Sequence, residues 1–248
     1  ALVTGAGPAP GCTGAPTSAD ARVEVEGDDW SYGWNAGVLY APTDRTRLGL
    51  AYRSSIEHEL DGDADFTGVP AALGAGGLFV DSAASAGIDL PETVSLSSWQ
   101  RISDRWAMMG DLTWTRWERF DELRVRFDQG AQGDSVQPED WDNTWRVSLG
   151  ASYFLDEHWT LRFGAAYDES PIPSAAKRTP RIPGNDRTWL ALGASYRAGE
   201  RLTVDVGYAH LFVDDTPIDA VDQSTGHVLR GEYDNGVDIL SAQARWVF

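Results

Sequence analysis

Alternation of apolar and polar residues along most of this chain is the feature that most constrains its fold. Over 159–168, every second residue from Trp159 to Tyr167 is apolar or alanine, and the residues between them are polar or small. The same pattern recurs at four further places, over 47–53, 144–153, 202–209 and 240–248. A period of two puts apolar side chains on one face of a β-strand and polar side chains on the other. The sequence therefore predicts an all-β protein, in which only 69–90 could hold a short helix.

The connections between these segments alternate between short and long. Short polar turns are expected at 43–45, 103–105, 156–158 and 198–200, and longer connections at 61–90, 128–140, 170–186 and 214–235. About nine strands are expected, over 22–41, 46–60, 91–102, 106–127, 141–155, 159–168, 187–197, 202–213 and 237–248. Short turns at one end and long loops at the other are typical of an up-and-down antiparallel barrel, with the short turns in the periplasm and the long loops outside the cell.

The two faces of the strands indicate which medium each one meets. The polar face consists of Gly, Ser, Ala and Thr with scattered Arg and Asp, which suits a crowded or water-filled interior. Aromatic residues, including many of the 11 Trp, lie near strand ends, where a transmembrane barrel has its interfacial girdles. The chain also finishes on an aromatic residue of an alternating strand, Phe248, as outer-membrane barrels do. The alternative is a secreted Trp-rich β-sandwich, such as a glycan-binding module.

Composition excludes several other classes of protein. The formal net charge of -18 argues against a nucleic-acid-binding protein, which needs a basic surface. A single cysteine, Cys12, rules out an internal disulfide framework. The sequence contains no run of about 18 apolar residues, so no transmembrane helix is predicted. No signal peptide is visible at the start of the chain.

Three blocks in order resemble the FadL family of outer-membrane long-chain fatty-acid transporters. They are DDWSYGWNAGVLYAPTDRTRLGLAYRSSIEHELDGD (28–63), LPETVSLSSWQRISDRWAMMGDLTWTRWERFDELRVRF (90–127) and the region 144–215, which begins TWRVSLGASYFLDEHWTLRFGAAYDESPIP. The resemblance implies a monomeric 14-stranded barrel in the outer membrane of a Gram-negative bacterium. It also implies an N-terminal hatch and passive uptake of long-chain fatty acids or other hydrophobic compounds, without a cofactor. Outer-membrane lipid and lipopolysaccharide would surround such a barrel.

Nine strands fit the last nine of fourteen. We therefore expect 1–248 to be a single barrel domain that is incomplete at its N-terminus, with the hatch and the first strands absent and 1–20 forming the tail of an extracellular loop. Nine strands alone would leave two open sheet edges, which lipid cannot satisfy.

An apolar connection is the first candidate for substrate binding. The region 61–90 carries many apolar side chains, and six of them form the predicted hydrophobic capture site: Phe66, Val69, Leu73, Leu78, Phe79 and Val80. Exposed apolar residues in such number need a binding partner or a packing partner. The resemblance implies that this connection and a second extracellular loop, ending near residue 20, form a groove that first captures the fatty acid. The alternative is that 69–80 only packs against that loop.

Arginines on the polar face are the second candidate. Arg146, Arg162 and Arg53 are expected to point into the barrel, where a guanidinium can bind a carboxylate in a bidentate way. Arg146 and Arg162 form the favoured pair because they lie on adjacent predicted strands beside small residues. Inward acids, Asp111, Asp168 and Asp205, are expected to pair with some of the arginines. The basic run 177–181 either attracts fatty carboxylates and lipopolysaccharide phosphates or is only a solvated loop.

Catalytic and metal-binding patterns are weak in this sequence. The four histidines have no serine and acid arranged around them as a hydrolase requires, so we expect no enzyme. No spacing predicts a transition-metal site, and DGDAD (61–65) is a weak candidate for Ca²⁺. The resemblance to the FadL family thus favours a fatty-acid channel as the function, with a general or substrate-specific porin as the alternative and a glycan-binding module as a less favoured one.

Overall fold

The computed structural model describes residues 21–221 and 228–248. The strands of its larger sheet are β2 (Asn35–Thr43), β3 (Thr46–Arg53), β6 (Thr93–Arg101), β7 (Trp106–Thr115), β10 (Thr144–Phe154), β11 (Trp159–Asp168), β12 (Arg187–Ala198), β13 (Leu202–Val213) and β16 (Gly236–Trp246). The remaining elements are β1 (Arg22–Asp28), β4 (Ile56–Thr67), α1 (Ala71–Gly74), β5 (Ser82–Leu90), η1 (Trp117–Arg119), β8 (Glu122–Phe127), β9 (Ser135–Pro138), β14 (Thr216–Val221) and β15 (Val228–Tyr233). Among the described residues, no helix is long and apolar enough to cross a membrane.

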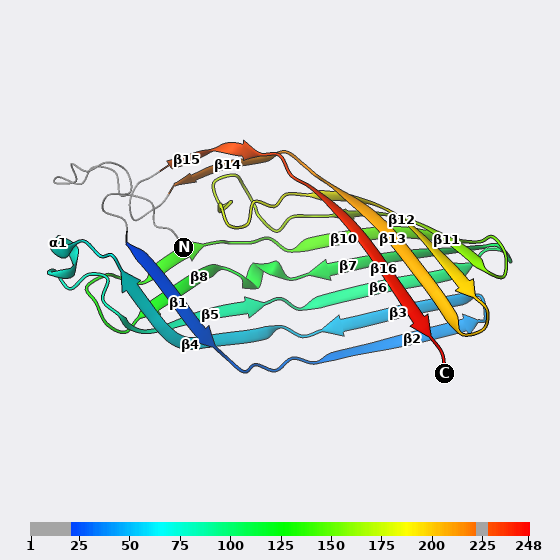
Figure 1. Ribbon diagram of the computed structural model, residues 1–248, viewed down its shortest axis with the longest axis horizontal. Coiled ribbons are helices and arrows are strands. Elements are labelled where there is room, and N and C mark those ends of the chain that lie inside the picture. The colour runs from blue at the N-terminus through cyan, green and yellow to red at the C-terminus, as the bar shows by residue number, and fades with distance from the viewer. Residues whose placement is uncertain (1–20, 222–227) are drawn as a thin grey trace.

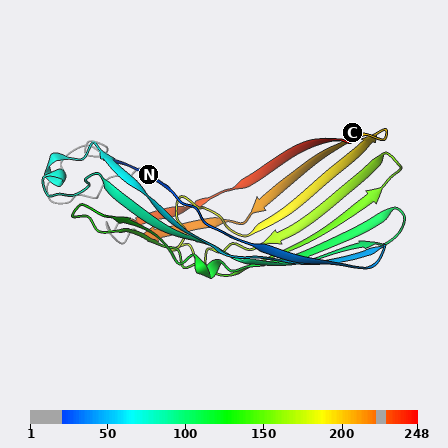
Figure 2. The ribbon, with the colours of Figure 1, turned by 90° about the horizontal axis from the view of Figure 1, so that it is seen from below.

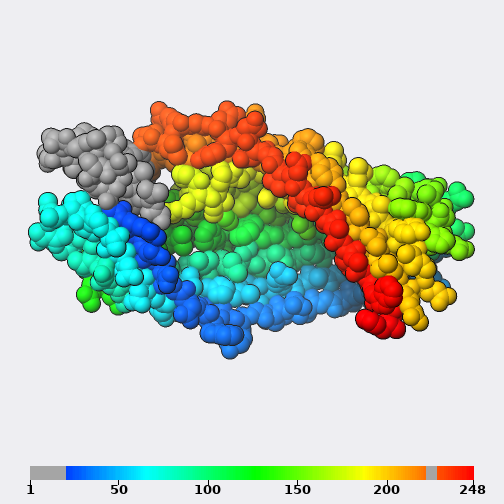
Figure 3. All heavy atoms as spheres, viewed as in Figure 1, coloured from blue at the N-terminus to red at the C-terminus, as the bar shows by residue number. Residues whose placement is uncertain are grey.

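Nine strands form one antiparallel sheet in the order β16-β13-β12-β11-β10-β7-β6-β3-β2. The sheet curves into an open trough (Figures 1 and 2), and its hollow is visible between β1 and β16 in the space-filling view (Figure 3). The short turns between consecutive hairpin strands all lie at the end of the trough where β16 finishes (Figure 1). The prediction of nine barrel strands with short turns at one end is confirmed.

Strand register sorts the side chains of this sheet onto two chemically different faces. One row of register partners runs Val38, Leu50, Leu96, Leu112 and Val147, whereas the neighbouring row on the other face runs Gly49, Ser97, Asp111, Ser148 and Ala166. Small side chains of the polar face are buried, including Ala107, Ser152 and Ser195, while large apolar side chains of the other face are exposed. Because side chains crowd together on the inside of a curved sheet, the polar face is the concave one.

Aromatic residues border the apolar face at both ends. At the short-turn end, the ring of Trp106 packs at a tilt against that of Tyr153 with centroids 4.7 Å apart, and Trp159 packs in the same way against Tyr196 at 4.8 Å. At the opposite end, Trp114 and Trp145 are register partners on β7 and β10. A single sheet with an exposed apolar face between two aromatic rows is suited to lipid contact. This arrangement differs from a β-sandwich, in which a second sheet covers the apolar face.

The first strands are shorter than predicted because each one breaks. The predicted strands 22–41, 46–60 and 106–127 divide into β1 and β2, β3 and β4, and β7 and β8. Beyond the breaks, a second sheet forms in the order β1-β4-β5-β8-β9. Local hydrogen bonds replace the strand ladder at these breaks. Ser54, between β3 and β4, bonds to the backbone of Trp34, between β1 and β2, and η1 separates β7 from β8.

The long connection predicted at 61–90 is mostly strand, which corrects the sequence analysis. β4 continues to Thr67, and β5 begins at Ser82 and pairs with it from Ile56–Leu90 to Ala64–Ser82. Alternation continues through both strands, but glycines and acidic residues at many positions made the region resemble a loop. Only 68–81 lies outside the strands, and it contains the short helix α1. The connection 214–235 likewise contains a hairpin, β14–β15.

The register makes a prediction about lipid exposure. Leu149, in the middle of β10, is 64% exposed on the apolar face, and Ser148 points to the concave face. In the complete barrel, Leu149→Arg should destabilise the folded state by roughly 2–4 kcal/mol, because an arginine at mid-membrane depth must leave water. Ser148→Arg should cost much less. Urea unfolding in lipid vesicles measures both variants, and equal losses would contradict the assignment of the two faces.

Candidate functional site

The aromatic residues of the predicted capture site meet at the far end of the second sheet. The ring centroid of Phe66, on β4, lies 5.7 Å from that of Phe79 and 5.8 Å from that of Phe127, on β8. We call these three residues the Phe66 cluster. Phe79 has a φ of 56°, and its backbone N–H donates to Oε1 of Gln132 at 2.8 Å. A non-glycine residue in this region is strained, so surrounding contacts hold the ring in place.

The other predicted capture residues surround this cluster unevenly. Val69, Leu78 and Val80 are half-buried, whereas Leu73, on α1, is 39% exposed. The loop also bonds to its neighbour 128–134, since the N–H of Ala131 donates to the carbonyl of Gly77 at 2.8 Å. The described residues thus show packing within this loop region. The predicted partner loop, 1–20, lies outside the described residues.

An ion-pair cluster lies between the two sheets. Glu92, in the two-residue break between β5 and β6, accepts from Nε of Arg119 at 2.5 Å and from Nη1 of Arg116 at 3.2 Å. Arg116 also contacts Glu118 at 2.5 Å, and Glu118 accepts from Asn143 at 2.7 Å. The side chain of Glu92 is only 10% exposed. Its carboxylate joins the segment between β5 and β6 to residues 116–119, which follow β7, at the level where the strands of the larger sheet break. We call this level the bend.

Burial and hydrogen bonding act on Glu92 in opposite directions. Burial alone would raise its pKa, but its own backbone N–H and the two guanidinium groups hold the pKa below its usual range. A carboxyl group whose pKa is lowered on folding stabilises the folded state at any pH above its ordinary, unfolded-state pKa. This stabilisation is lost as the pH falls through the folded-state pKa. For the nearby Glu139, burial raises the pKa although Nε1 of Trp141 donates to it at 3.0 Å.

The predicted arginine pair does not come together, which corrects the sequence analysis. Arg146 is the register partner of Asp168, whereas Arg162 is the partner of Ser152, six positions further along the same two strands. At about 3.3 Å per residue, that separation is roughly 20 Å. Arg162 is already engaged, because it binds Ser195 and contacts Asp205 at 3.3 Å. The sequence correctly placed Arg146 and Arg162 on adjacent strands, but it did not show how far apart they lie along those strands.

Among the residues that the structure describes, Arg146 and Arg53 differ from Arg162 in having no polar partner for their side chains. Both lie on the concave face, and neither makes a salt bridge or a side-chain hydrogen bond within the described part of the chain. Asp168, the neighbour of Arg146, instead contacts Arg187 at 3.1 Å. The expected pairing of inward acids with arginines therefore holds for Asp205, while Asp168 pairs with a residue that the sequence analysis left out.

Two unsatisfied donors on the concave face were also missed. Nε of Arg187 and Nε1 of Trp189 are buried without an acceptor among the described residues. Both residues lie on β12, two positions apart and on the same face as Arg146. No sequence signal separates this tryptophan from the girdle aromatics except its parity: Trp189 falls on the polar side of the alternation.

The basic run 177–181 is largely a structural element rather than an exposed anion site. Arg178 is 4% exposed, and it donates to the carbonyls of Gly184, at 3.0 Å, and Pro217. Lys177 pairs with Asp140. Burial lowers the pKa of Arg178. Arg178 thus fixes the connection 170–186 against β14 and is not available as an exposed anion site.

The acidic segment 61–65 faces more acids. Asp61, Asp63 and Asp65 of β4 are the register partners of Asp28, Glu26 and Glu24 of β1. Within the residues that the structure describes, no group of three or more His, Cys, Asp or Glu side chains is arranged to hold a metal ion. The weak Ca²⁺ candidate therefore gains no support.

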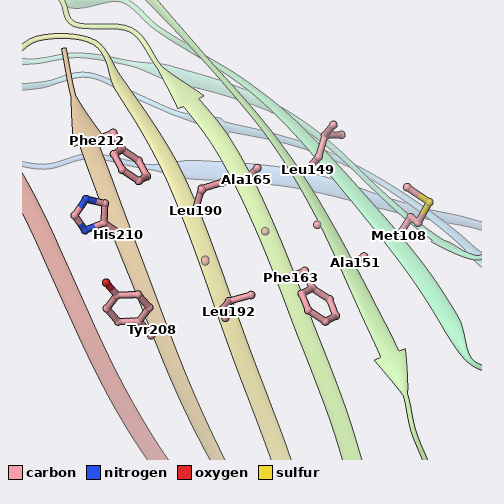
Figure 4. Close-up of a pocket in the computed structure, with 13 residues that line it drawn as sticks. Met108, Leu149, Ala151, Phe163, Ala165, Leu190, Leu192, Tyr208, His210 and Phe212 are labelled. Carbon is pink, nitrogen blue, oxygen red and sulfur yellow. The ribbon is translucent and has the colours of Figure 1, made fainter.

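A hollow of about 570 Å³ lies on the apolar face, over strands β7 and β10–β13 (Figure 4). Its walls include Leu149, Phe163 and Leu192, and its floor consists of glycines and alanines. At one end, Asp238 accepts from Oη of Tyr208 at 2.6 Å and lies 2.7 Å from Nδ1 of His210. Because this face is the exposed apolar one, the hollow opens toward the membrane rather than into the trough.

The ion-pair cluster makes a prediction about the bend. Glu92→Gln should weaken the bend by about 1–3 kcal/mol, since the nearly buried carboxylate and its two charge-assisted hydrogen bonds to Arg116 and Arg119 are lost. Hydrogen exchange of residues 116–121 measures local opening. The difference from the parent should be largest at neutral pH and should shrink below pH 4.5, the ordinary value for this carboxyl.

Glu118→Gln is the matched control, because that carboxylate is 48% exposed and exposed ion pairs contribute little. A pH-independent effect of Glu92→Gln would contradict the role of the ionised carboxylate.

Comparison with known proteins relates this chain to one family of outer membrane proteins. The family model described as "Outer membrane protein transport protein (OMPP1/FadL/TodX)" matches residues 4–248. The long-chain fatty acid transport protein of Escherichia coli O6:H1 is 35% identical over 195 residues, covering 75% of this chain and 43% of that protein. Outer membrane protein P1 of Haemophilus influenzae is 38% identical over 183 residues, covering 73% of this chain and 38% of that protein.

Solved structures agree with this relationship. The crystal structure of a Pseudomonas aeruginosa FadL homologue superposes with a TM-score of 0.83 at 30% identity, covering 95% of this chain and 56% of that one. The Ralstonia pickettii toluene transporter TbuX, at 19% identity and a TM-score of 0.62, shares the fold and covers 96% of this chain and 53% of its own. The chain spans about half the length of the relatives it matches. It belongs to the OMPP1/FadL/TodX family of outer membrane proteins.

Proposed function

We propose that the complete protein is an outer-membrane channel for passive uptake of hydrophobic compounds, with long-chain fatty acids as its favoured substrates. The observation that carries the proposal is the register of the nine-stranded sheet, which gives a lipid-facing apolar side and a concave side of small and polar residues. Such a wall suits a lumen through which a molecule passes. In this proposal the barrel is monomeric and contacts outer-membrane lipid and lipopolysaccharide.

Fatty acids are favoured over aromatic hydrocarbons because of the relatives. Proteins named long-chain fatty acid transport protein are 32–35% identical to this chain. The toluene transporters, at 19% and 18% identity, support only the fold. Arg146 and Arg53 lie on the concave face and have no salt bridge among the described residues, so they would supply donors for a carboxylate. A hydrocarbon has no carboxylate.

The Phe66 cluster is the proposed capture site. It brings three aromatic rings together at the end of the molecule opposite the short turns (Figure 1), beside the exposed Leu73. Phe66, Val69, Leu73, Leu78, Phe79 and Val80 remain the proposed capture residues. An acyl chain that displaced Phe79 would replace the packing of one ring and release its strained backbone.

A general porin is the second candidate, because Arg47, Asp111 and three serines, Ser97, Ser98 and Ser148, are among the residues that line a hollow of about 550 Å³ on the concave face. Conductance separates the two functions. The complete protein in a planar bilayer should show no stable pore if a plug closes the lumen, as fatty-acid uptake requires. A steady, ohmic conductance of porin size would reject the transporter.

The capture site makes a prediction about uptake. Phe79→Asn removes the ring while keeping a residue that tolerates positive φ. Uptake of a long-chain fatty acid at limiting concentration should fall roughly 10-fold, since burying one Phe side chain is worth about 1.5–3 kcal/mol. High substrate should restore part of the rate, because only capture is weakened.

The control is Val136→Asn, on the neighbouring strand β9 and 40% exposed but outside the cluster. Radiolabelled fatty-acid uptake in cells with matched surface levels measures both variants. Equal uptake by Phe79→Asn and the parent would show that the cluster serves packing alone.

A further inference from the structure

A carboxylate projects from the apolar face of the nine-stranded sheet. Asp238, on β16, is the register partner of His210 on β13, and His210 continues a row that runs through Leu190 to Leu149. This row belongs to the apolar face, so Asp238 points toward lipid, and its side chain is 67% exposed. A charged group on the lipid-facing side of a barrel costs free energy unless a partner compensates for it. The position of Asp238 therefore calls for a partner.

Only one oxygen of this carboxylate is bonded. Oδ1 of Asp238 accepts from Oη of Tyr208 at 2.6 Å and lies 2.7 Å from Nδ1 of His210. The ring of Phe212 packs edge-on against the imidazole of His210 with centroids 4.3 Å apart, which holds the imidazole in place. Oδ2 makes no hydrogen bond or ion pair to the residues that the structure describes. Because an ionised carboxylate accepts through both oxygens and donates through neither, the partner must supply a donor.

The hollow of about 570 Å³ on the apolar face, which we call the outer hollow, begins beside this cluster (Figure 4). Tyr208 and His210 line one end, near the long-loop end of β13, and Met108 lines the other, two residues from the short-turn end of β7. Four strand spacings of about 4.8 Å separate these ends, so the outer hollow extends roughly 19 Å across the strands. Ala151 and Ala165 keep it open between larger side chains. An apolar groove with polar groups at one end suits a flexible chain that has a polar head.

We propose that the outer hollow holds one acyl chain of a membrane lipid and that Asp238 binds the ammonium of the lipid head group. The apolar lining contacts the chain, and an ammonium supplies both the donor and the opposite charge that a carboxylate requires. A head group that carries only phosphate or carboxylate oxygens supplies no donor and is repelled. Phosphatidylethanolamine has the required ammonium. This lipid lies outside the lumen, so the site does not depend on which compound the channel transports.

Lipid binding to the purified complete protein in a neutral detergent tests the site. Phosphatidylethanolamine and phosphatidylglycerol with identical acyl chains are the probes, because the second replaces the ammonium with neutral hydroxyl groups. Native mass spectrometry of the titrated protein gives a dissociation constant for each lipid.

Two variants separate the head-group contact from the chain contact. Asp238→Asn removes the charge and keeps the shape, and its control is Asp104→Asn, at an acid that is 88% exposed in a short turn. Ala165→Phe fills the outer hollow, and its control is Leu96→Phe, at a position on β6 that is 55% exposed on the same face.

The parent should bind phosphatidylethanolamine about 10-fold more tightly than phosphatidylglycerol, the size expected for a hydrogen bond between charged groups. Asp238→Asn should remove this preference, Ala165→Phe should weaken binding of both lipids, and both controls should match the parent. Equal affinities in the parent, or a preference that survives Asp238→Asn, would overturn the head-group site. Parental binding of both lipids by Ala165→Phe would overturn the chain site. If Asp238→Asn lowers the unfolding temperature and leaves the preference unchanged, the partner of Asp238 is a cation elsewhere in the complete barrel and the proposal is wrong.

Discussion

The structure depends on strand register in the nine-stranded sheet. Because side chains alternate, a slip of one residue between two strands would move every leucine of one face into the lumen and every arginine into lipid. The register is therefore fixed by two media at once. Rows such as Leu50, Leu96 and Leu112 meet lipid, and rows such as Gly49, Ser97 and Asp111 meet the interior. The same register determines where the polar side chains of the concave face lie.

The bend limits where the membrane wall ends. Four strands of the wall break at nearly one level, and β1, β4, β5 and β8 continue beyond it as a separate sheet. Glu92 lies at this level between two guanidinium groups. A nearly buried carboxylate is stable in this position because both guanidinium groups donate hydrogen bonds to it. Two members of the Phe66 cluster, Phe66 and Phe127, lie on strands β4 and β8, and only Phe79 lies on the connection 68–81. The position of the cluster therefore follows largely from the hairpins that continue the strands of the larger sheet.

Alternation predicted the sheet, its nine strands and the end that holds the short turns, because period and turn length are local properties of the sequence. It did not predict the breaks, which depend on contacts such as that between Ser54 and Trp34 across strands. The candidate site was predicted in part. Parity placed Arg146 and Arg162 on the correct face, but their separation depends on register, which no single strand contains. Trp189 was not singled out from the sequence, although its parity places it on the polar side of the alternation.

The pairing of β1 with β4 places like charges opposite each other on one face and apolar residues opposite each other on the other face. Three acids of β1 lie directly opposite three acids of β4, as in Glu26 and Asp63, and like charges in these positions repel. The opposite face of the same strands pairs Val23 with Phe66 and Val25 with Ala64. Burial of that apolar face must outweigh the repulsion, yet Val25 is still 48% exposed. Anything that covers this face, whether another segment of the protein or an acyl chain beside the Phe66 cluster, therefore stabilises the strands that carry the cluster.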